Sequence, residues 1–234
     1  MSLTIGSARI DENGNISGGK PGDQTGKEVS TQPYYAHSKG WICMRPKSVS
    51  VANAIAQAML QACKNDNIGY CQGHRTTVIE QLRKSGSLAK ISAKTEADCS
   101  SLVRACCIQT GFDPGNFNTS SEVSALKASK QFMEPITVTA DTTLYNGDIL
   151  VTKTKGHTVV VVSGNSRKAA SCYPKYTGKS DSIVSALAAV GEKDTSKTHR
   201  AKIAAANGIK NYSYSAAQNL EMVKLLKKGK LIKA

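Results

Sequence analysis

The sequence has few aromatic residues and no long apolar run. Three Phe and one Trp occur in 234 residues, and aromatic residues make up 5% of the chain. Nucleic-acid-binding surfaces combine basic residues with exposed aromatic side chains, so this scarcity, with the lack of a known reader motif, argues against a nucleic-acid partner. No stretch approaches the roughly eighteen apolar residues of a membrane-spanning helix. We therefore expect no integral membrane segment.

The sequence also shows no pattern of a signal peptide, a disulfide framework or a zinc finger. Residues 1–7 contain neither a basic region nor an apolar region, so we expect a protein made in the cytoplasm without a signal peptide. The seven cysteines are odd in number and irregularly spaced, which favours reduced thiols over a disulfide framework. Cys63, Cys71 and His74 fit no common zinc-finger spacing and have no evident fourth ligand. We therefore expect no metal and no cofactor.

Acidic residues are the minority charge. There are 17 Asp and Glu against 31 Lys and Arg, which gives a net charge of +14 and points to an anionic partner such as nucleic acid, a membrane surface or bacterial wall polymers. Residues 173–234 hold a net +8 of this charge. Their apolar positions predict three short helices, so we expect a small, basic, mainly helical domain at 173–234 after a larger domain at 1–172.

The larger domain is predicted to have an α+β fold. Apolar spacing predicts amphipathic helices at 49–65 and 74–85, and Thr119 to Glu122 has the pattern of a capping box. After Pro135 the pattern changes to Val- and Thr-rich segments between turns, which predicts antiparallel strands. The expected strands are residues 136–139, 148–152, 157–163 and 169–172, and a hairpin is expected around Asn13 and Gly14. Helices before a small sheet indicate α+β rather than parallel α/β.

Cys99 is the first candidate for chemistry. Asp98 is a good N-cap residue, and Leu102, Val103 and Cys106 follow at helical spacing, so we expect Cys99 on the first turn of a helix. The unpaired amides and the positive dipole end there are expected to lower the thiol pKa and to produce a nucleophile. The alternative is a structural cysteine, because most free cysteines are buried small hydrophobes.

His157 is the second candidate. It precedes the apolar run Thr158–Val162, which places it at the start of a buried strand. A histidine in this position can take the proton of a cysteine thiol and return it to a leaving amine. An isolated histidine is more often a surface or structural residue. This one stands at a strand start, downstream of a cysteine on a capped helix, which is the arrangement that a Cys–His hydrolase needs.

These segments resemble a known family. Asp98–Val103, Gly147–Leu150 and Gly156–Val160 are similar to motifs of the NlpC/P60 cysteine peptidases, which are papain-like peptidoglycan hydrolases. Residues 22–28 and 68–70 look like the version carried by phage endolysins. The resemblance implies a papain-like fold, Cys99 as nucleophile with its backbone amide as an oxyanion donor, and His157 as general base.

The resemblance also implies further site residues. The family usually has His, Asn or Gln about a dozen positions after the histidine to orient its ring, but Ala169 stands there. Asn165 is the nearest residue of suitable chemistry, and the alternatives are that Asn165 only forms a turn and that a backbone carbonyl or water orients His157. Tyr70 and Gln24 are expected to line the cleft. Asp98 and Ser100 are expected beside the nucleophile, with Asp98 as a helix cap.

The resemblance therefore predicts an endolysin that cleaves an amide in the peptidoglycan stem peptide or cross-bridge. The basic domain at 173–234 is similar to wall-binding modules of lysins, so peptidoglycan and its anionic polymers are the expected partners. Without a signal peptide, release to the wall would depend on a membrane-permeabilising holin. The alternatives are an N-acetylmuramoyl-L-alanine amidase with the same chemistry and a non-catalytic basic module that binds wall polymer or nucleic acid.

Overall fold

A computed structural model describes residues 2–10, 15, 21–22, 27–167 and 171–234. The chain divides into two compact units, Met1–Lys168 and Ala169–Ala234, called unit 1 and unit 2 below. The sequence places this boundary at residue 172. Unit 1 holds the strands of the sheet and all the expected site residues.

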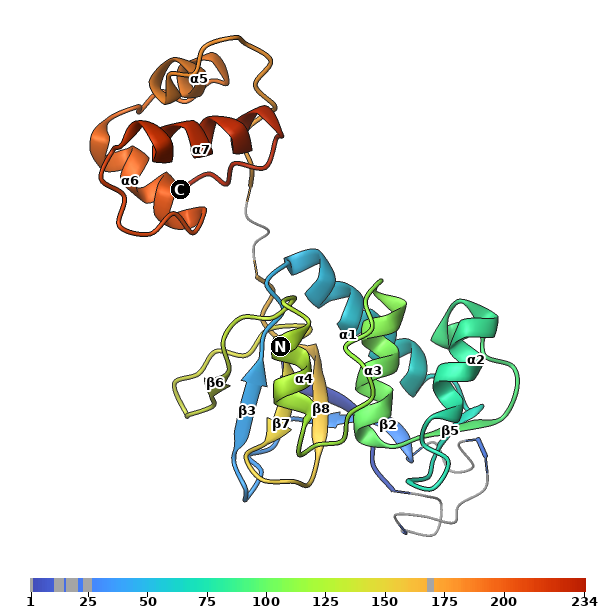
Figure 1. Cartoon of the computed structure of the whole chain (residues 1–234). Helices are drawn as coiled ribbons and strands as arrows, with labels where there is room; N and C mark the ends of the chain where they lie inside the picture. Colours follow the sequence, from blue (N-terminus) through green and yellow to red (C-terminus); the bar gives the residue numbers. More distant parts are fainter. Residues whose placement is uncertain (1, 11–14, 16–20, 23–26, 168–170) are drawn as a thin grey trace. The chain divides into compact units, whose positions relative to one another are not determined.

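Unit 1 is built on a six-stranded antiparallel sheet with the order β2-β1-β8-β7-β3-β6 (Figure 1). The strands are β1 (Thr4–Ala8), β2 (Val29–Pro33), β3 (Trp41–Met44), β6 (Ile136–Thr137), β7 (Ile149–Thr152) and β8 (Thr158–Ser163). The predicted α+β class with an antiparallel sheet is confirmed. The predicted order of helices before the sheet is wrong, because β1, β2 and β3 precede the first helix and pair with strands from much later in the chain.

The sheet is covered on one face by α1 (Val49–Cys63) and α3 (Cys99–Gln109), which confirms the first expected helix. The valines of β8 alternate between two cores. Val160 and Val162 pack with the helices, whereas Val159 and Val161 pack with Trp41 on the other face. This alternation is the period of an extended strand, and it explains why the run is apolar throughout.

A parallel pair of short strands delivers the chain to α3. β4 (Ile68–Tyr70) pairs with β5 (Thr95–Ala97), and β5 ends immediately before Asp98. The connection contains α2 (Thr77–Ser85) and a short 3-10 helix (Leu88–Lys90). α2 begins later than the predicted residue 74 and ends as expected at Gly86, which has a φ of 72°.

Two predicted β segments fall largely outside the described residues. Asn13 and Gly14 of the expected hairpin are not among them, and neither is the first half of the segment 169–172. Its last residue, Cys172, forms an isolated bridge with Ile232 of unit 2. The prediction that this segment extends the sheet is therefore wrong for its described end.

Unit 2 consists of α5 (Ile183–Ala189), α6 (Lys197–Ala206) and α7 (Ala216–Lys227), as the apolar spacing predicts. A serine caps each helix, and its side chain accepts a hydrogen bond from a backbone N–H of the first turn. The helices enclose a core of their own, which includes Leu187, Ile203 and Met222. None of the helices in the described ranges is long and apolar enough to cross a membrane.

Candidate active site

Cys99 is the first residue of α3, as predicted. The Asp98 carboxylate accepts a hydrogen bond of 2.7 Å from the backbone N–H of Ser101, and the Ser101 hydroxyl accepts one of 2.9 Å from the N–H of Asp98. This reciprocal arrangement is a capping box. The predicted role of Asp98 as helix cap is confirmed, and the cap fixes the direction in which the side chain of Cys99 projects from the helix.

Arg75 holds this cap in place. Its Nη1 donates to both carboxylate oxygens of Asp98, at 3.1 and 2.9 Å, and to Ser100 Oγ at 2.8 Å. Its Nη2 donates to Asn116 Oδ1 at 2.9 Å and to the carbonyl of Phe117 at 2.8 Å. One guanidinium therefore joins the start of α3 to the loop beyond its end. The sequence analysis missed Arg75 because it lies far from Asp98 in the chain and belongs to no local motif.

Replacing Arg75 by alanine is expected to destabilise unit 1 by about 3–5 kcal/mol, because a largely buried carboxylate loses its cation. The matched control is Arg83→Ala, since Arg83 contacts Asp113 at 3.5 Å with 61% of its side chain exposed, and such a pair contributes about 0–1 kcal/mol. Urea unfolding followed by the fluorescence of Trp41, the single tryptophan, reports on unit 1. Equal losses for the two variants would contradict the role of Arg75.

A cleft of about 410 Å³ opens beside Cys99. Among the expected residues, Asp98, Cys99 and Ser100 line it. The other lining residues are Gln72, Arg75, Asn118, Thr119, Lys155 and Gly156. The lining is therefore mostly polar, includes the cations Arg75 and Lys155 and the Cys99 side chain, and encloses a volume in the range of small-molecule binding sites.

The Cys99 thiol is not activated in this state. Burial raises its pKa to about 12, and the charges of Asp98 and Glu122 add to this effect. Hydrogen bonds from the backbone N–H groups of Thr158 and Ser100 lower the pKa by less. The predicted lowering of the pKa is wrong, because desolvation and two acidic neighbours outweigh the helix terminus. The thiol keeps its proton near neutral pH, so attack on a substrate requires a base.

Glu122 and Thr119 hold the segment that faces Cys99. Glu122 begins α4 (Glu122–Ala128), and its buried Oε1 accepts a hydrogen bond of 2.8 Å from Thr158 Oγ1. Thr119 Oγ1 accepts one of 3.1 Å from the N–H of Gly156. The predicted capping box of Thr119 and Glu122 is wrong, because Ser121 is the N-cap and makes no side-chain cap bond. Both side chains point instead to the start of β8.

Glu122 makes the stability of unit 1 dependent on pH. Burial raises its pKa well above 4.5, so the native state keeps a proton that the unfolded chain loses as the pH rises past that value. The free energy of unfolding of the wild-type chain therefore decreases as the pH rises from the pKa of Glu122 in the unfolded chain toward its higher pKa in the native state. The amide of Glu122→Gln does not titrate. The stability difference in favour of Glu122→Gln is expected to grow by about 1.4 kcal/mol per pH unit.

The measurement is urea unfolding of both chains at several values between about pH 5 and pH 7. Glu80→Gln is the control, since Glu80 is exposed on α2. A stability difference for Glu122→Gln that does not change with pH would contradict the buried neutral carboxyl.

His157 lies next to Thr158 in the chain, but its ring is on the other face of the sheet. Thr158 points to Glu122, and the ring centroid of His157 lies 6.5 Å from that of Trp41. Burial lowers the pKa of His157 to about 4, with smaller contributions from His37 and Arg9. Among the described residues no hydrogen bond joins His157 to Cys99. The structure therefore brings the backbone of His157 to the site but leaves its ring beside Trp41.

Tyr70, Asn165 and Gln24 are the remaining predicted site residues. Tyr70 is buried and is not among the lining residues of the Cys99 cleft, so the prediction that it lines the cleft is wrong. Burial raises its pKa to about 12, and the charges of the nearby Cys99 and Asp98 add to this effect. Asn165 is not near His157, since the whole of β8 lies between them and Asn165 Nδ2 donates to the carbonyl of Leu144 at 3.5 Å. Gln24 and Ala169 lie outside the described residues.

Comparison with known proteins gives one match. Residues 5–168 match a family model described as an endolysin-like domain. This range covers most of the chain, including Cys99 and His157, and it ends at the boundary between the two units. No curated protein and no solved structure gives a significant match.

Proposed function

The chain belongs to the endolysin-like domain family, and we propose that it is a cysteine peptidase of phage-endolysin type that cleaves an amide bond in peptidoglycan. Family membership suggests a hydrolase that acts on the cell wall. The finer proposal is a papain-like enzyme of the NlpC/P60 kind, acting on the stem peptide or cross-bridge. The observation that carries it is Cys99, a thiol on the first turn of a capped helix in the lining of a polar cleft.

The proposed reaction has two stages. Cys99 Sγ attacks the carbonyl carbon of the amide, the thiol proton passes to a base and then to the nitrogen, and the amine leaves as the thioester forms. Water then attacks the thioester, which releases a carboxylate and restores the thiol. The backbone N–H of Cys99, at the start of α3, is the proposed donor to the oxyanion. Asp98 is paired with Arg75, and its proposed role is to hold the start of α3 in position.

His157 is the proposed base. Its lowered pKa keeps the imidazole neutral, and its neighbour Thr158 donates to the thiolate form of Cys99. The ring lies beside Trp41 on the face of the sheet opposite to Cys99, so contact with the thiol requires the backbone at His157, which precedes β8, to change its conformation when substrate occupies the cleft. Catalytic hydrogen bonds often form only in the substrate complex.

The test of the proposed activity is digestion of purified peptidoglycan from several bacteria, followed by mass analysis of the released fragments. Peptide-bond cleavage creates new amino and carboxyl ends without new reducing sugar ends. Cleavage between muramic acid and alanine would identify the amidase alternative within the same chemistry. Release of no fragment from any wall would overturn the proposed function.

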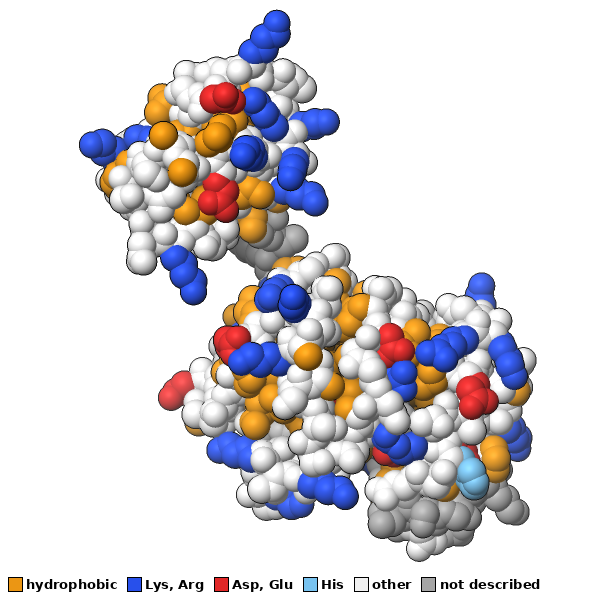
Figure 2. Space-filling model, in the orientation of Figure 1, with side chains coloured by type: hydrophobic (Ala, Val, Ile, Leu, Met, Phe, Trp, Pro, Cys, Tyr) orange, Lys and Arg blue, Asp and Glu red, His pale blue; other side chains and the backbone are white. Residues whose placement is uncertain are grey.

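Unit 2 is the proposed wall-binding module. Residues 173–234 carry a net charge of +8, and Lys and Arg side chains are spread over its visible face (Figure 2). Tyr214 is 38% exposed, and the side-chain cations of Lys197 and Arg200 lie 5.6 and 5.8 Å from its ring centroid. Such a surface suits an anionic polymer with apolar or sugar-like faces.

Deletion of residues 173–234 is expected to reduce adsorption to purified walls and to leave hydrolysis of soluble peptidoglycan fragments intact. The reason is that unit 1 contains the complete cleft, whereas most of the net charge lies in unit 2. Co-sedimentation with walls at low and high salt measures adsorption, and salt is expected to weaken it. Unchanged adsorption of the shortened chain would contradict the proposed role of unit 2.

A further inference from the structure

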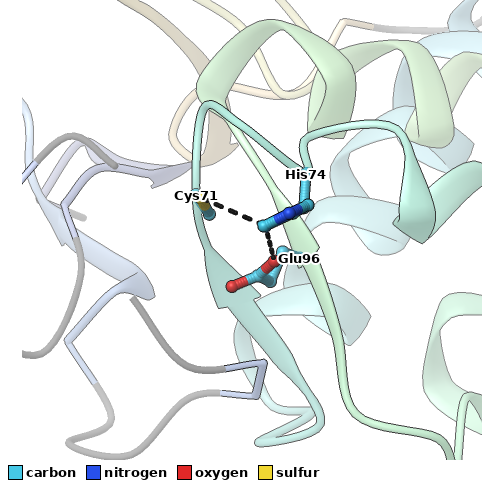
Figure 3. A group of neighbouring side chains, drawn as sticks. All are labelled: Cys71, His74 and Glu96. Carbon is cyan, nitrogen blue, oxygen red and sulfur yellow. Dashed lines mark hydrogen bonds and ion pairs between the residues drawn. The ribbon is translucent and has the colours of Figure 1, made fainter. Parts of the chain in front are cut away.

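Cys71, His74 and Glu96 meet close to the cleft but outside its lining. Cys71 directly follows β4, His74 lies in the loop before α2, and Glu96 is the middle residue of β5. Their side chains point toward one another (Figure 3). His74 Nδ1 lies 3.7 Å from Cys71 Sγ and 3.1 Å from Glu96 Oε2, and the three ligand atoms all lie within 4.8 Å of one another.

These separations suit three ligands of one tetrahedral ion. With Zn–S of about 2.3 Å, Zn–N of about 2.0–2.1 Å and Zn–O of about 2.0–2.2 Å, ligand atoms at tetrahedral angles lie roughly 3.3–3.6 Å apart. The observed distances of 3.7 and 3.1 Å need only small side-chain adjustments to meet this. A thiolate, an imidazole and a carboxylate are a donor set that favours zinc over magnesium or calcium.

The contacts of the His74 imidazole distinguish a metal site from a second catalytic triad. In a cysteine–histidine–acid relay the thiol and the carboxylate contact different nitrogens of the ring. Here both approach the same nitrogen, His74 Nδ1. His74 Nδ1, Cys71 Sγ and Glu96 Oε2 therefore surround one common position, where an ion would sit.

The backbone around the three residues is fixed by hydrogen bonds. The N–H of Cys71 donates to the carbonyl of Ala97 at 3.1 Å. Thr77 Oγ1 accepts from the N–H of Glu96 at 3.0 Å, and the N–H of Thr77 donates to the carbonyl of His74 at 3.1 Å. Cys71 and Glu96 are buried, whereas 68% of the His74 side chain is exposed. The site is therefore preorganised on one side and open to solvent on the other.

We propose that Cys71, His74 and Glu96 bind one zinc-class divalent ion, with the fourth position open to water. Cys63, whose spacing to Cys71 and His74 fits no zinc finger, is not part of the group, and Glu96 supplies a ligand that local spacing does not reveal. The ion would tie the loop before α2 to β5, two residues before the Asp98 cap. The proposal goes beyond the hydrolase function and does not depend on it.

The test is titration of the full-length, reduced, chelator-treated chain with Co²⁺, followed by competition with Zn²⁺. One equivalent is expected to bind with a thiolate-to-cobalt charge-transfer absorption, which Zn²⁺ abolishes by displacement. Cys71→Ser is expected to lose this absorption, and His74→Ala to weaken binding at least about tenfold. Because His74 is exposed, its loss leaves the fold intact, and Trp41 fluorescence checks both variants.

Cys172→Ser is the matched control, since Cys172 is the exposed free cysteine, and it is expected to keep the absorption and the stoichiometry. Failure of the wild-type chain to bind Co²⁺ or Zn²⁺ would overturn the proposal, as would a charge-transfer band that survives in Cys71→Ser. The readout is absorbance, so its failure is distinct from a failure to hydrolyse peptidoglycan.

Discussion

Cys99→Ala is expected to lower the rate of fragment release from peptidoglycan by about 10³-fold or more, because the covalent route is lost. The thiol is the nucleophilic group in the cleft. The side chains of its neighbours Asp98 and Ser100 accept hydrogen bonds from Arg75, and Asp98 also caps α3. The rate is measured as soluble fragments released per unit time from purified walls.

Cys106→Ala is the control for this variant. Cys106 lies on the same helix, is fully buried and does not line the cleft, so its loss tests packing alone. We expect Cys106→Ala to unfold at a lower urea concentration and to keep its hydrolytic rate within a few fold. Equal activity of wild type and Cys99→Ala would exclude Cys99 as the nucleophile.

His157→Ala is expected to lower the rate by about 10²–10⁴-fold, the usual contribution of a general base. The thiol of Cys99 has a pKa of about 12, so it depends on a proton acceptor near neutral pH. A histidine acts as a base only when it is neutral, and burial lowers the pKa of His157 to about 4. The acid limb of kcat/KM is therefore expected near pH 4, below the value of about 6.5 for an exposed histidine.

His37→Ala is the matched control, since His37 belongs to the same aromatic group around Trp41 and lies outside the Cys99 cleft. Its rate is expected to stay close to wild type. If His157→Ala retained the wild-type rate and pH profile, the base would have to be another group.

Local rules in the sequence were sufficient for the elements that carry Cys99. An N-cap residue and helical apolar spacing act within a few residues, so Asp98 and the start of α3 are predictable. The same holds for α1 and the three helices of unit 2. By contrast, β1, β2 and β3 are short and exist through pairing with distant strands, and β4 and β5 have only three residues each. Their periodicity is too brief to detect.

The details of the site depend on contacts between distant segments. The pKa of Cys99 is set by burial and by Glu122, and Arg75 reaches Asp98 from another element. The face on which His157 lies depends on strand register, because a shift of one residue moves every side chain to the other face. A motif specifies the order of residues along the chain and does not specify this register.

Alkylation of the reduced wild-type chain with iodoacetamide tests most directly whether Cys99 is the nucleophile. Peptide mass mapping follows all seven cysteines, and the same samples are assayed for peptidoglycan hydrolysis. We predict that the exposed Cys172 reacts first without loss of activity. Hydrolysis should then fall in proportion to the modification of Cys99, which should accelerate as the pH rises toward its pKa of about 12. Undiminished hydrolysis by a chain with Cys99 fully alkylated would contradict the proposed mechanism.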